Sequence, residues 1–185
     1  MLSYRAMHPV HDVVVPADIA TYVPALIEIP RGSHMKYEVD KDTGLLRLDR
    51  VLYSAVHYPA NYGFIPQTHA DDGDPLDILV LMQEPVIPLT IVRARALGGL
   101  RMRDDKGEDD KIVAVCIDDP AVAHYTSTDQ LPPHLLRELD RFFRDYKFLE
   151  GKESIVDSMY DRSTALAVIS AARISYERGD WKTAK

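Results

Sequence analysis

Cysteine is almost absent from this chain of 185 residues, and the single one present excludes an intramolecular disulfide. Cys116 lies in the apolar run 112–117, where we expect a small core side chain rather than a metal ligand or a nucleophile. The chain is long enough to bury a core without disulfides or a structural metal. Its apolar share of 46% is ordinary for a globular protein, and a disordered chain would have fewer apolar residues.

Long hydrophobic runs and an excess of basic residues are also absent. No apolar run approaches the roughly 20 residues that span a bilayer, and the N-terminus lacks the apolar segment of a signal peptide. We therefore expect a cytoplasmic protein without a membrane partner. The 29 acidic and 22 basic residues give a formal net charge of −7, which disfavours general binding to nucleic acid because like charges repel.

Between residues 24 and 120 the chain consists of short apolar runs separated by clusters of glycine, proline and aspartate. The turn signal at 42–44, between two alternating segments, predicts a hairpin over 36–52. Strands are predicted at residues 25–29, 36–40, 45–52, 76–82, 91–97 and 111–117. Several short strands of this kind are typical of a small barrel or sandwich.

The C-terminal third changes to a helical period. Apolar residues of segment 132–147 recur on one helix face, and a second helix is expected from a cap at Ser163 to Arg178, with Gly179 as its stop. The sequence thus predicts a mainly β protein with flanking helices (α+β).

No linker is long enough to divide the chain, so we expect one domain over residues 1–185. Its expected parts are an irregular or helical arm at 1–20, a barrel at 24–120 and helices at 131–178.

Four carboxylates occur within the seven residues from Asp71 to Asp77. Carboxylates that converge repel one another unless they are solvated, protonated or bound to cations. Asp77 enters an apolar strand and should therefore lie near the core, where a merely solvated loop would not need an acid. Ligands that are all oxygen favour a hard cation, Mg²⁺ or Mn²⁺.

A second acidic segment covers residues 104–111 and, taken alone, reads as an exposed turn between two strands. Two acidic loops at strand ends can converge at one end of a barrel, however, so the combination favours a shared site. Elsewhere Lys36 and Glu38 lie on one face of a strand, and Arg50 is followed by Tyr58 and Tyr62. Arginine, lysine and tyrosine are donors suited to phosphate oxygens, although each alone is also an ordinary surface or core residue.

Together these segments resemble family I soluble inorganic pyrophosphatases. The most specific match is Asp72-Gly73-Asp74-Pro75-Leu76-Asp77, which has every acid of the family's D-x-D-P-x-D signature. The other matching segments, in the family's order, are Glu28-Ile29-Pro30, Lys36-Tyr37-Glu38-Val39-Asp40, Asp49-Arg50, Tyr58-Pro59-Ala60-Asn61-Tyr62-Gly63, the acidic segment 104–111, and Phe142-Phe143 with Tyr146-Lys147.

The resemblance implies a five-stranded OB-like barrel with two C-terminal helices. It also implies hydrolysis of pyrophosphate to two orthophosphates with three or four Mg²⁺ ions, for which Mn²⁺ is a possible substitute. Bacterial members of the family are often hexamers, so the resemblance favours a homo-oligomer, a hexamer before a dimer.

Residue roles follow from the resemblance position by position. Asp72, Asp77 and Asp109 correspond to ligands of the two metals that bind the attacking water, and Asp104 with Asp109 to ligands of a metal that enters with the substrate. Asp74 corresponds to the general base. The substrate-binding residues are Lys36, Arg50, Tyr62, Tyr146 and Lys147, and Glu28, Glu38, Tyr58 and Lys111 complete the site.

Three other functions compete with this interpretation. A single-stranded nucleic-acid-binding OB module would need a basic groove and stacking platforms, which the acidic loops oppose. A metal-dependent nucleotide hydrolase would need a means of holding a base or ribose, and the sequence has no P-loop. A pyrophosphatase-like chain without activity is disfavoured because the matched acids and cations are all present.

Overall fold

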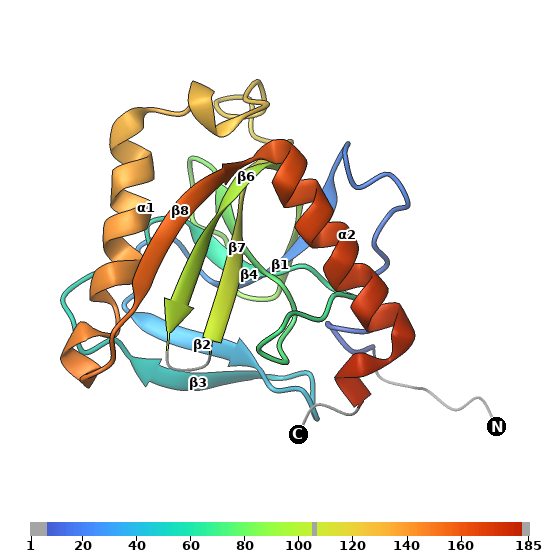
Figure 1. Cartoon of the computed structure of the whole chain (residues 1–185). Coiled ribbons are helices and arrows are strands. Elements are labelled where there is room, and N and C mark those ends of the chain that lie inside the picture. Colours follow the sequence, from blue (N-terminus) through green and yellow to red (C-terminus); the bar gives the residue numbers. More distant parts are fainter. Residues whose placement is uncertain (1–6, 105–106, 183–185) are drawn as a thin grey trace.

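The computed structural model describes residues 7–104 and 107–182, and its two α-helices flank a central sheet of strands (Figure 1). The strands are β1 (Val23–Ile29), β2 (Met35–Val39), β3 (Leu46–Val51), β4 (Asn61–Phe64), β5 (Asp77–Leu81), β6 (Thr90–Asp104), β7 (Gly107–Cys116) and β8 (Ile155–Asp161). The helices are α1 (Pro133–Asp145) and α2 (Arg162–Arg178), with short 3-10 turns at Thr128–Gln130, Phe148–Glu150 and Asp180–Lys182.

Five strands pair in a closed ring, which confirms the predicted barrel. β1 pairs with β4 on one side and with β6 on the other, and the order β1-β4-β5-β7-β6 returns to β1. The β5–β7 pairing is parallel, and the other pairings of the ring are antiparallel. Closing the sheet in this way removes the exposed edges that an open sheet leaves. β8 extends the sheet beyond the ring by pairing with the far half of β6.

The hairpin predicted over 36–52 is confirmed as a separate two-stranded sheet of β2 and β3, which lies below the barrel in Figure 1. Lys36 pairs with Arg50 and Glu38 with Arg47, so charged side chains from both strands share one face. The opposite face contributes Val39, which packs against Leu26 of β1. The hairpin therefore presents its charged face while it remains attached to the barrel.

The six predicted strands all form, but β6 and β7 are longer than expected, and β4 and β8 were not predicted. β4 has only four residues, and one of them is Gly63, which weakens the pattern. Gly63 is required because β4 crosses β1 closely: a Cβ there would lie 1.8 Å from the Leu26 carbonyl oxygen. In β8 apolar and polar residues come in pairs and do not alternate, and its partner β6 supplies the pairing that its sequence does not indicate.

Both predicted helices form, with one correction at the start of α2. The expected cap at Ser163 is wrong: Asp161 caps the helix, and its carboxylate accepts a hydrogen bond from the Thr164 N–H at 2.8 Å. The cap lies earlier because the chain passes from β8 into α2 with no intervening loop. Gly179 ends the helix with φ 82°, as predicted.

The remaining expectations concern the arm and the core. Residues 7–20 of the expected arm form turns and irregular chain, whereas residues 1–6 lie outside the described part of the structure. Cys116 is buried in the core, as expected. None of the helices in the described ranges is long and apolar enough to cross a membrane.

Candidate active site

A cavity of about 590 Å³ lies among the charged face of the β2–β3 hairpin, one end of the barrel and the end of α1. It is lined by thirteen of the fourteen predicted site residues: Glu28, Lys36, Glu38, Arg50, Tyr58, Tyr62, Asp72, Asp74, Asp77, Asp109, Lys111, Tyr146 and Lys147. The fourteenth, Asp104, ends β6 beside Gly107, but its side chain is outside the described part of the structure. The prediction for Asp104 therefore stays a prediction.

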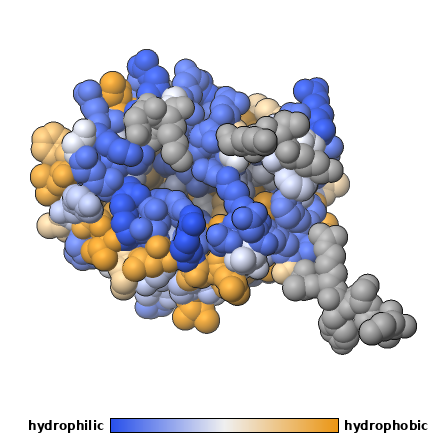
Figure 2. Space-filling view, turned by 90° about the horizontal axis from the view of Figure 1, so that it is seen from below, coloured by the Kyte–Doolittle hydropathy of each residue, from blue (hydrophilic) through white to orange (hydrophobic). Residues whose placement is uncertain are grey.

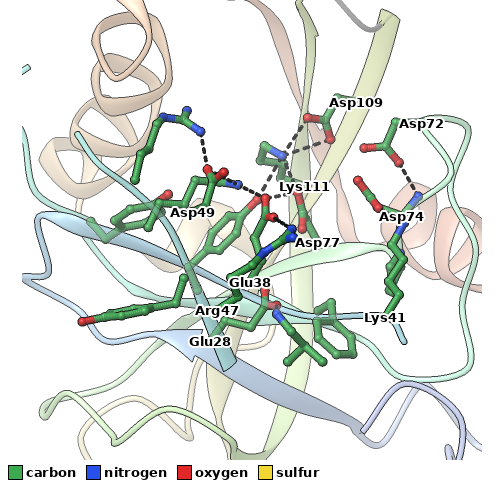
Figure 3. A pocket seen from close by; sticks show the side chains of 18 of the residues that line it. Glu28, Glu38, Lys41, Arg47, Asp49, Asp72, Asp74, Asp77, Asp109 and Lys111 are labelled. Carbon is green, nitrogen blue, oxygen red and sulfur yellow. Dashed lines mark hydrogen bonds and ion pairs between the residues drawn. The ribbon is translucent and has the colours of Figure 1, made fainter. Parts of the chain in front are cut away.

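One wall of this cavity carries Asp72 and Asp74 from the loop before β5 and Asp77 from the start of β5 (Figure 3). Gly73 takes a positive φ of 84°, which lets the loop turn sharply between two aspartates. The Asp72 carboxylate accepts a hydrogen bond from the Asp74 N–H at 3.0 Å, and Lys41 of the hairpin turn forms an ion pair with Asp74. The loop thus brings both carboxylates to the cavity, and the Asp74 side chain is 39% accessible.

Lys111 joins the two acidic segments at the centre of the site (Figure 3). Its ammonium group lies 2.6 Å from an Asp77 carboxylate oxygen and 2.8 Å from an Asp109 oxygen. It also donates to the Tyr62 hydroxyl at 3.2 Å, and that hydroxyl donates to Asp77. Parallel pairing of β5 with β7 sets Asp77 opposite Lys111, so the barrel backbone dictates this cluster.

The charges in this cluster perturb one another. Burial alone would lower the pKa of Lys111, but the charges of Asp77 and Asp109 outweigh it and raise that pKa. Burial, together with the charges of Asp77 and Asp72 and against the opposing charge of Lys111, raises the pKa of Asp109 to about 6. Burial likewise raises the pKa of Asp72, with Asp74 and Asp77 adding to the effect. The acids are therefore under electrostatic stress that a cation would relieve.

The donor set fits a hard divalent cation. Within the described ranges, no three acidic, histidine or cysteine side chains are gathered closely enough to form a metal site as they stand. Asp72, Asp77 and Asp109 nevertheless line one cavity, and the charge of Asp77 helps to raise the pKa of both Asp72 and Asp109, as expected of like charges that lie close together. Oxygen ligands of this kind suit Mg²⁺ or Mn²⁺, and binding requires rearrangement of the carboxylates that Lys111 now holds.

Cations and phenols form the other wall. Lys36 is paired with Glu38 and lies 3.3 Å from Asp49, while Arg50 is held by Asp49 and by Glu150. Tyr146 caps the end of α1, and the Lys147 ammonium lies 5.4 Å from the centre of its ring. The two walls thus give the cavity an acidic side and a donor-rich side.

The phenol rings pack as part of the core beneath the site. Tyr58 is only 2% exposed and contacts both Tyr62 and Phe142, with ring centroids 5.3 and 4.7 Å apart. Phe142 and Phe143 from α1 extend this aromatic cluster to Tyr146. Because these side chains are buried, the core interpretation of the tyrosines is confirmed. They also line the cavity, and their part in binding substrate stays a prediction.

Glu28 is a buried acid at the base of the cavity. It is 8% exposed, and its carboxylate accepts a hydrogen bond from the Val39 N–H at 2.5 Å. Burial raises the pKa of Glu28 to about 8, and the charge of Asp77 adds to the rise. Folding therefore takes up a proton at this residue at neutral pH.

This raised pKa gives the metal-free protein a specific pH dependence. The contribution of Glu28 to the free energy of unfolding is greatest below pH 4.5, its ordinary pKa, and is lost as pH rises toward 8. The reason is that between these two pH values the unfolded chain binds fewer protons than the folded chain. Glu28→Gln removes that ionisation. In thermal melts with chelator, we expect the free energy of unfolding of the variant to rise relative to that of the wild type between pH 5 and pH 8, by at most about 1.4 kcal/mol per pH unit. A stability difference independent of pH would contradict the raised pKa.

Comparison with known proteins identifies the family. A profile described as inorganic pyrophosphatase matches residues 25–177 of this chain. The chain belongs to the inorganic pyrophosphatase family. It is 51% identical over 179 residues to soluble inorganic pyrophosphatase 2 of Chlamydomonas reinhardtii, covering 96% of this chain and 93% of that protein. It is also 51% identical over 164 residues to the soluble inorganic pyrophosphatase of Zea mays, covering 89% and 77%.

Solved pyrophosphatase structures share the fold. The inorganic pyrophosphatase of Thermus thermophilus superimposes with a TM-score of 0.86 at 41% identity, covering 89% of this chain and 97% of that one. The enzyme of Helicobacter pylori gives a TM-score of 0.85 at 40% identity, covering 89% and 98%. The resemblance read from the motifs is therefore confirmed at the level of family and fold.

The structure also adds residues to the site that the motif analysis left without a role. Lys41, Arg47 and Lys152 line the cavity and increase its positive charge. Lys41 directly follows a matched motif, and Arg47 alternates with Asp49 on β3, so spacing could have indicated both. Glu150 had no such signal, because it lies in a short turn after α1 and reaches Arg50 only through the fold.

Proposed function

We propose that this chain hydrolyses inorganic pyrophosphate to two orthophosphates, as an inorganic diphosphatase that requires Mg²⁺. The observation that carries the proposal is the cavity itself, whose acidic wall faces a wall of cations and phenols. Pyrophosphate is a compact polyanion, so its hydrolysis needs positioning and neutralisation of charge more than covalent chemistry. The two walls supply those two requirements.

We assign the metal ligands to Asp72, Asp77, Asp104 and Asp109, with three or four Mg²⁺ ions in the loaded site and Mn²⁺ as a substitute. When bound, Mg²⁺ makes a water molecule more acidic and neutralises charge on the phosphates. The protein's own part is to hold Asp77 at the start of β5 and Asp109 near the start of β7, with Asp72 in the loop before β5.

Asp74 is proposed as the general base that takes the proton of the attacking water. Its side chain is more accessible than those of Asp77 and Asp109, at 39% against 24% and 17%. Lys41 and the Gly73 turn restrict where the Asp74 carboxylate points. An aspartate is basic enough for this task when the water has already been made acidic.

The donor-rich wall is proposed to grip the phosphate oxygens. These substrate-binding residues are Lys36, Arg50, Tyr62, Tyr146 and Lys147, supported by Glu28, Glu38, Tyr58 and Lys111. Glu38 is paired with Lys36, and Lys111 orients Tyr62 through its hydroxyl. The supporting residues thus act by holding the donors in place.

The direct test is phosphate release from pyrophosphate by the purified protein, with Mg²⁺ and with chelator, and with ATP as a parallel substrate. We expect fast, chelator-sensitive release from pyrophosphate and little from ATP, because the cavity is lined by charged groups suited to a small polyanion. No release by folded, Mg²⁺-loaded protein would overturn the proposal. Comparable release from ATP would instead support a nucleotide hydrolase.

Mg²⁺ should also stabilise the folded chain, because a ligand that binds only the native state shifts unfolding by mass action. At a concentration 100 times its dissociation constant the gain is about 2.7 kcal/mol. We expect a rise in melting temperature that Asp72→Asn reduces. Asp118→Asn is the matched control, since Asp118 is an exposed acid outside the cavity. Equal Mg²⁺ shifts in both variants would count against Asp72 as a ligand.

We further propose that the chain works in the cytoplasm as a single domain and as a homo-oligomer, a hexamer before a dimer. Figure 2 shows one face on which hydrophobic patches lie among mostly hydrophilic side chains. Large apolar side chains such as Ile87 and Phe148 are 78% and 70% exposed in the single chain, and association would cover groups of this kind. Light scattering of the purified protein measures the assembly directly.

A further inference from the structure

The guanidinium group of Arg50 is held on two sides and unpaired on the third. Its Nε–H donates to a Glu150 carboxylate oxygen at 2.7 Å, and its Nη1 donates to Asp49 at 2.5 Å. Its Nη2 is buried and has no hydrogen-bond partner among the residues that the structure describes. A buried donor without an acceptor is unusual and calls for a ligand.

The surroundings of Arg50 indicate the chemistry of that ligand. Arg50 lines the cavity together with Lys36 and Lys147, and the acceptor that three cations favour is an anion. A guanidinium presents a rigid planar set of donors, and its direction is fixed once two of its nitrogens are anchored. The two carboxylates therefore determine where Nη2 points.

Glu150 is the better buried of the two anchors. Its side chain is 12% exposed, compared with 29% for Asp49. It ends the 3-10 turn Phe148–Glu150, where its N–H donates to the Lys147 carbonyl at 3.0 Å and Gly151 closes the turn with φ 73°. Glu150 thus extends from a compact turn and not from a free loop.

The contact also joins two separate parts of the phosphate-binding wall. Arg50 lies on β3, whereas Glu150 follows Tyr146 and Lys147 at the end of α1, 100 residues further along the chain. This ion pair therefore connects the β2–β3 hairpin with the turn that follows α1, beside the cavity. Loss of the contact would free both the guanidinium and the spacing between the two groups of donors.

We propose that Glu150 is a positioning residue for substrate, which orients the Arg50 guanidinium so that Nη2 meets a phosphate oxygen. This inference rests on the proposed pyrophosphatase function and deepens it. Glu150 itself touches no phosphate, because both groups are anionic. Its effect on the reaction passes through Arg50.

Two conservative variants separate placement from charge. Glu150→Gln keeps the length of the side chain and an oxygen acceptor but removes the charge. Glu150→Asp keeps the charge but withdraws the acceptor by one methylene. If placement matters, the Gln variant should stay within about threefold of the wild-type KM, while the Asp and Ala variants should raise KM about tenfold with little change in kcat.

The opposite patterns overturn the proposal. A negative charge near an anionic substrate opposes binding, so a purely electrostatic Glu150 predicts a lower KM in both the Gln and Ala variants. A purely structural Glu150 predicts lower melting temperatures with an unchanged KM in the Asp and Ala variants. Melting temperatures are measured for all variants, and the Gln and Asp pair still decides the question if Glu150→Ala fails to fold.

A double-mutant cycle tests whether the effect passes through Arg50. In an Arg50→Gln background, Glu150→Asp should change KM less than about twofold, because the group that it positions has been removed. A tenfold effect that persists in that background would overturn the proposal. Activity of the wild type keeps this test separate from the proposed function: an inactive wild type defeats that function, whereas an active wild type with an unaffected Glu150→Asp variant defeats only this inference.

Discussion

Asp74→Asn should lower kcat by a factor of about 10² to 10⁴ and leave the fold intact, because it removes the proposed general base and keeps the shape of the side chain. The Lys41 ammonium still has the Gly73 carbonyl as an acceptor at 3.1 Å, so the loop keeps one of its anchors. Steady-state phosphate release with Mg²⁺, together with a thermal melt, measures both effects.

Asp71→Asn is the matched control for this experiment. Asp71 lies in the same loop and carries the same charge, but it is exposed and does not line the cavity. Its replacement should change kcat by less than about twofold, in line with the small effects of exposed substitutions. Near-normal turnover of Asp74→Asn, or an equal loss in both variants, would remove Asp74 from the base role.

Lys111→Met should lower the free energy of unfolding by about 3 kcal/mol in chelator at pH 8, because it leaves two largely buried carboxylates without their counterion. The Lys111 side chain is only 3% exposed and contacts both Asp77 and Asp109. Mg²⁺ should recover part of the loss, since a divalent cation replaces the missing positive charge. Denaturant unfolding with and without Mg²⁺ measures both effects.

Lys41→Met provides the comparison, because Lys41 also pairs with an acid of the site but is 59% exposed. Exposed ion pairs contribute about 0 to 1 kcal/mol, so this variant should unfold close to the wild type. If Lys111→Met is no less stable than Lys41→Met, burial of the Lys111 cluster does not hold the site together in the way the geometry implies.

Local pattern accounts for most of the predicted elements. The alternation over 36–52 and the turn at 42–44 gave the hairpin, and the helical period over 132–147 gave α1, because each signal arises between residues close in the chain. β4 and β8 were missed for the converse reason. β4 is short and β8 lacks the alternation of a strand, and both are stabilised by neighbours that no local window contains.

The residues of the site likewise divide into those that motifs indicate and those that only the fold brings together. The order of the motifs brought Asp72, Asp74, Asp77 and Lys111 to attention, and the structure gathers them in one cavity. Their roles in catalysis and metal binding remain predictions that the variants above address. The role of Asp104 as a metal ligand stays a prediction too. The Arg50–Glu150 contact had no sequence signal, because its partners are 100 residues apart.

The sequence by itself determined the family, the strand-then-helix order and the residue types of the site, because these depend on local periodicity and on motifs written contiguously in the chain. Only the tertiary structure decided how the charges balance. Closure of β1 onto β6, and the register of β5 against β7, place Lys111 between Asp77 and Asp109. Packing of the hairpin near the end of α1 likewise brings Glu150 to Arg50 and leaves Nη2 of Arg50 without a hydrogen-bond partner among the described residues. Such arrangements depend on distances between segments far apart in the chain, which no local pattern encodes.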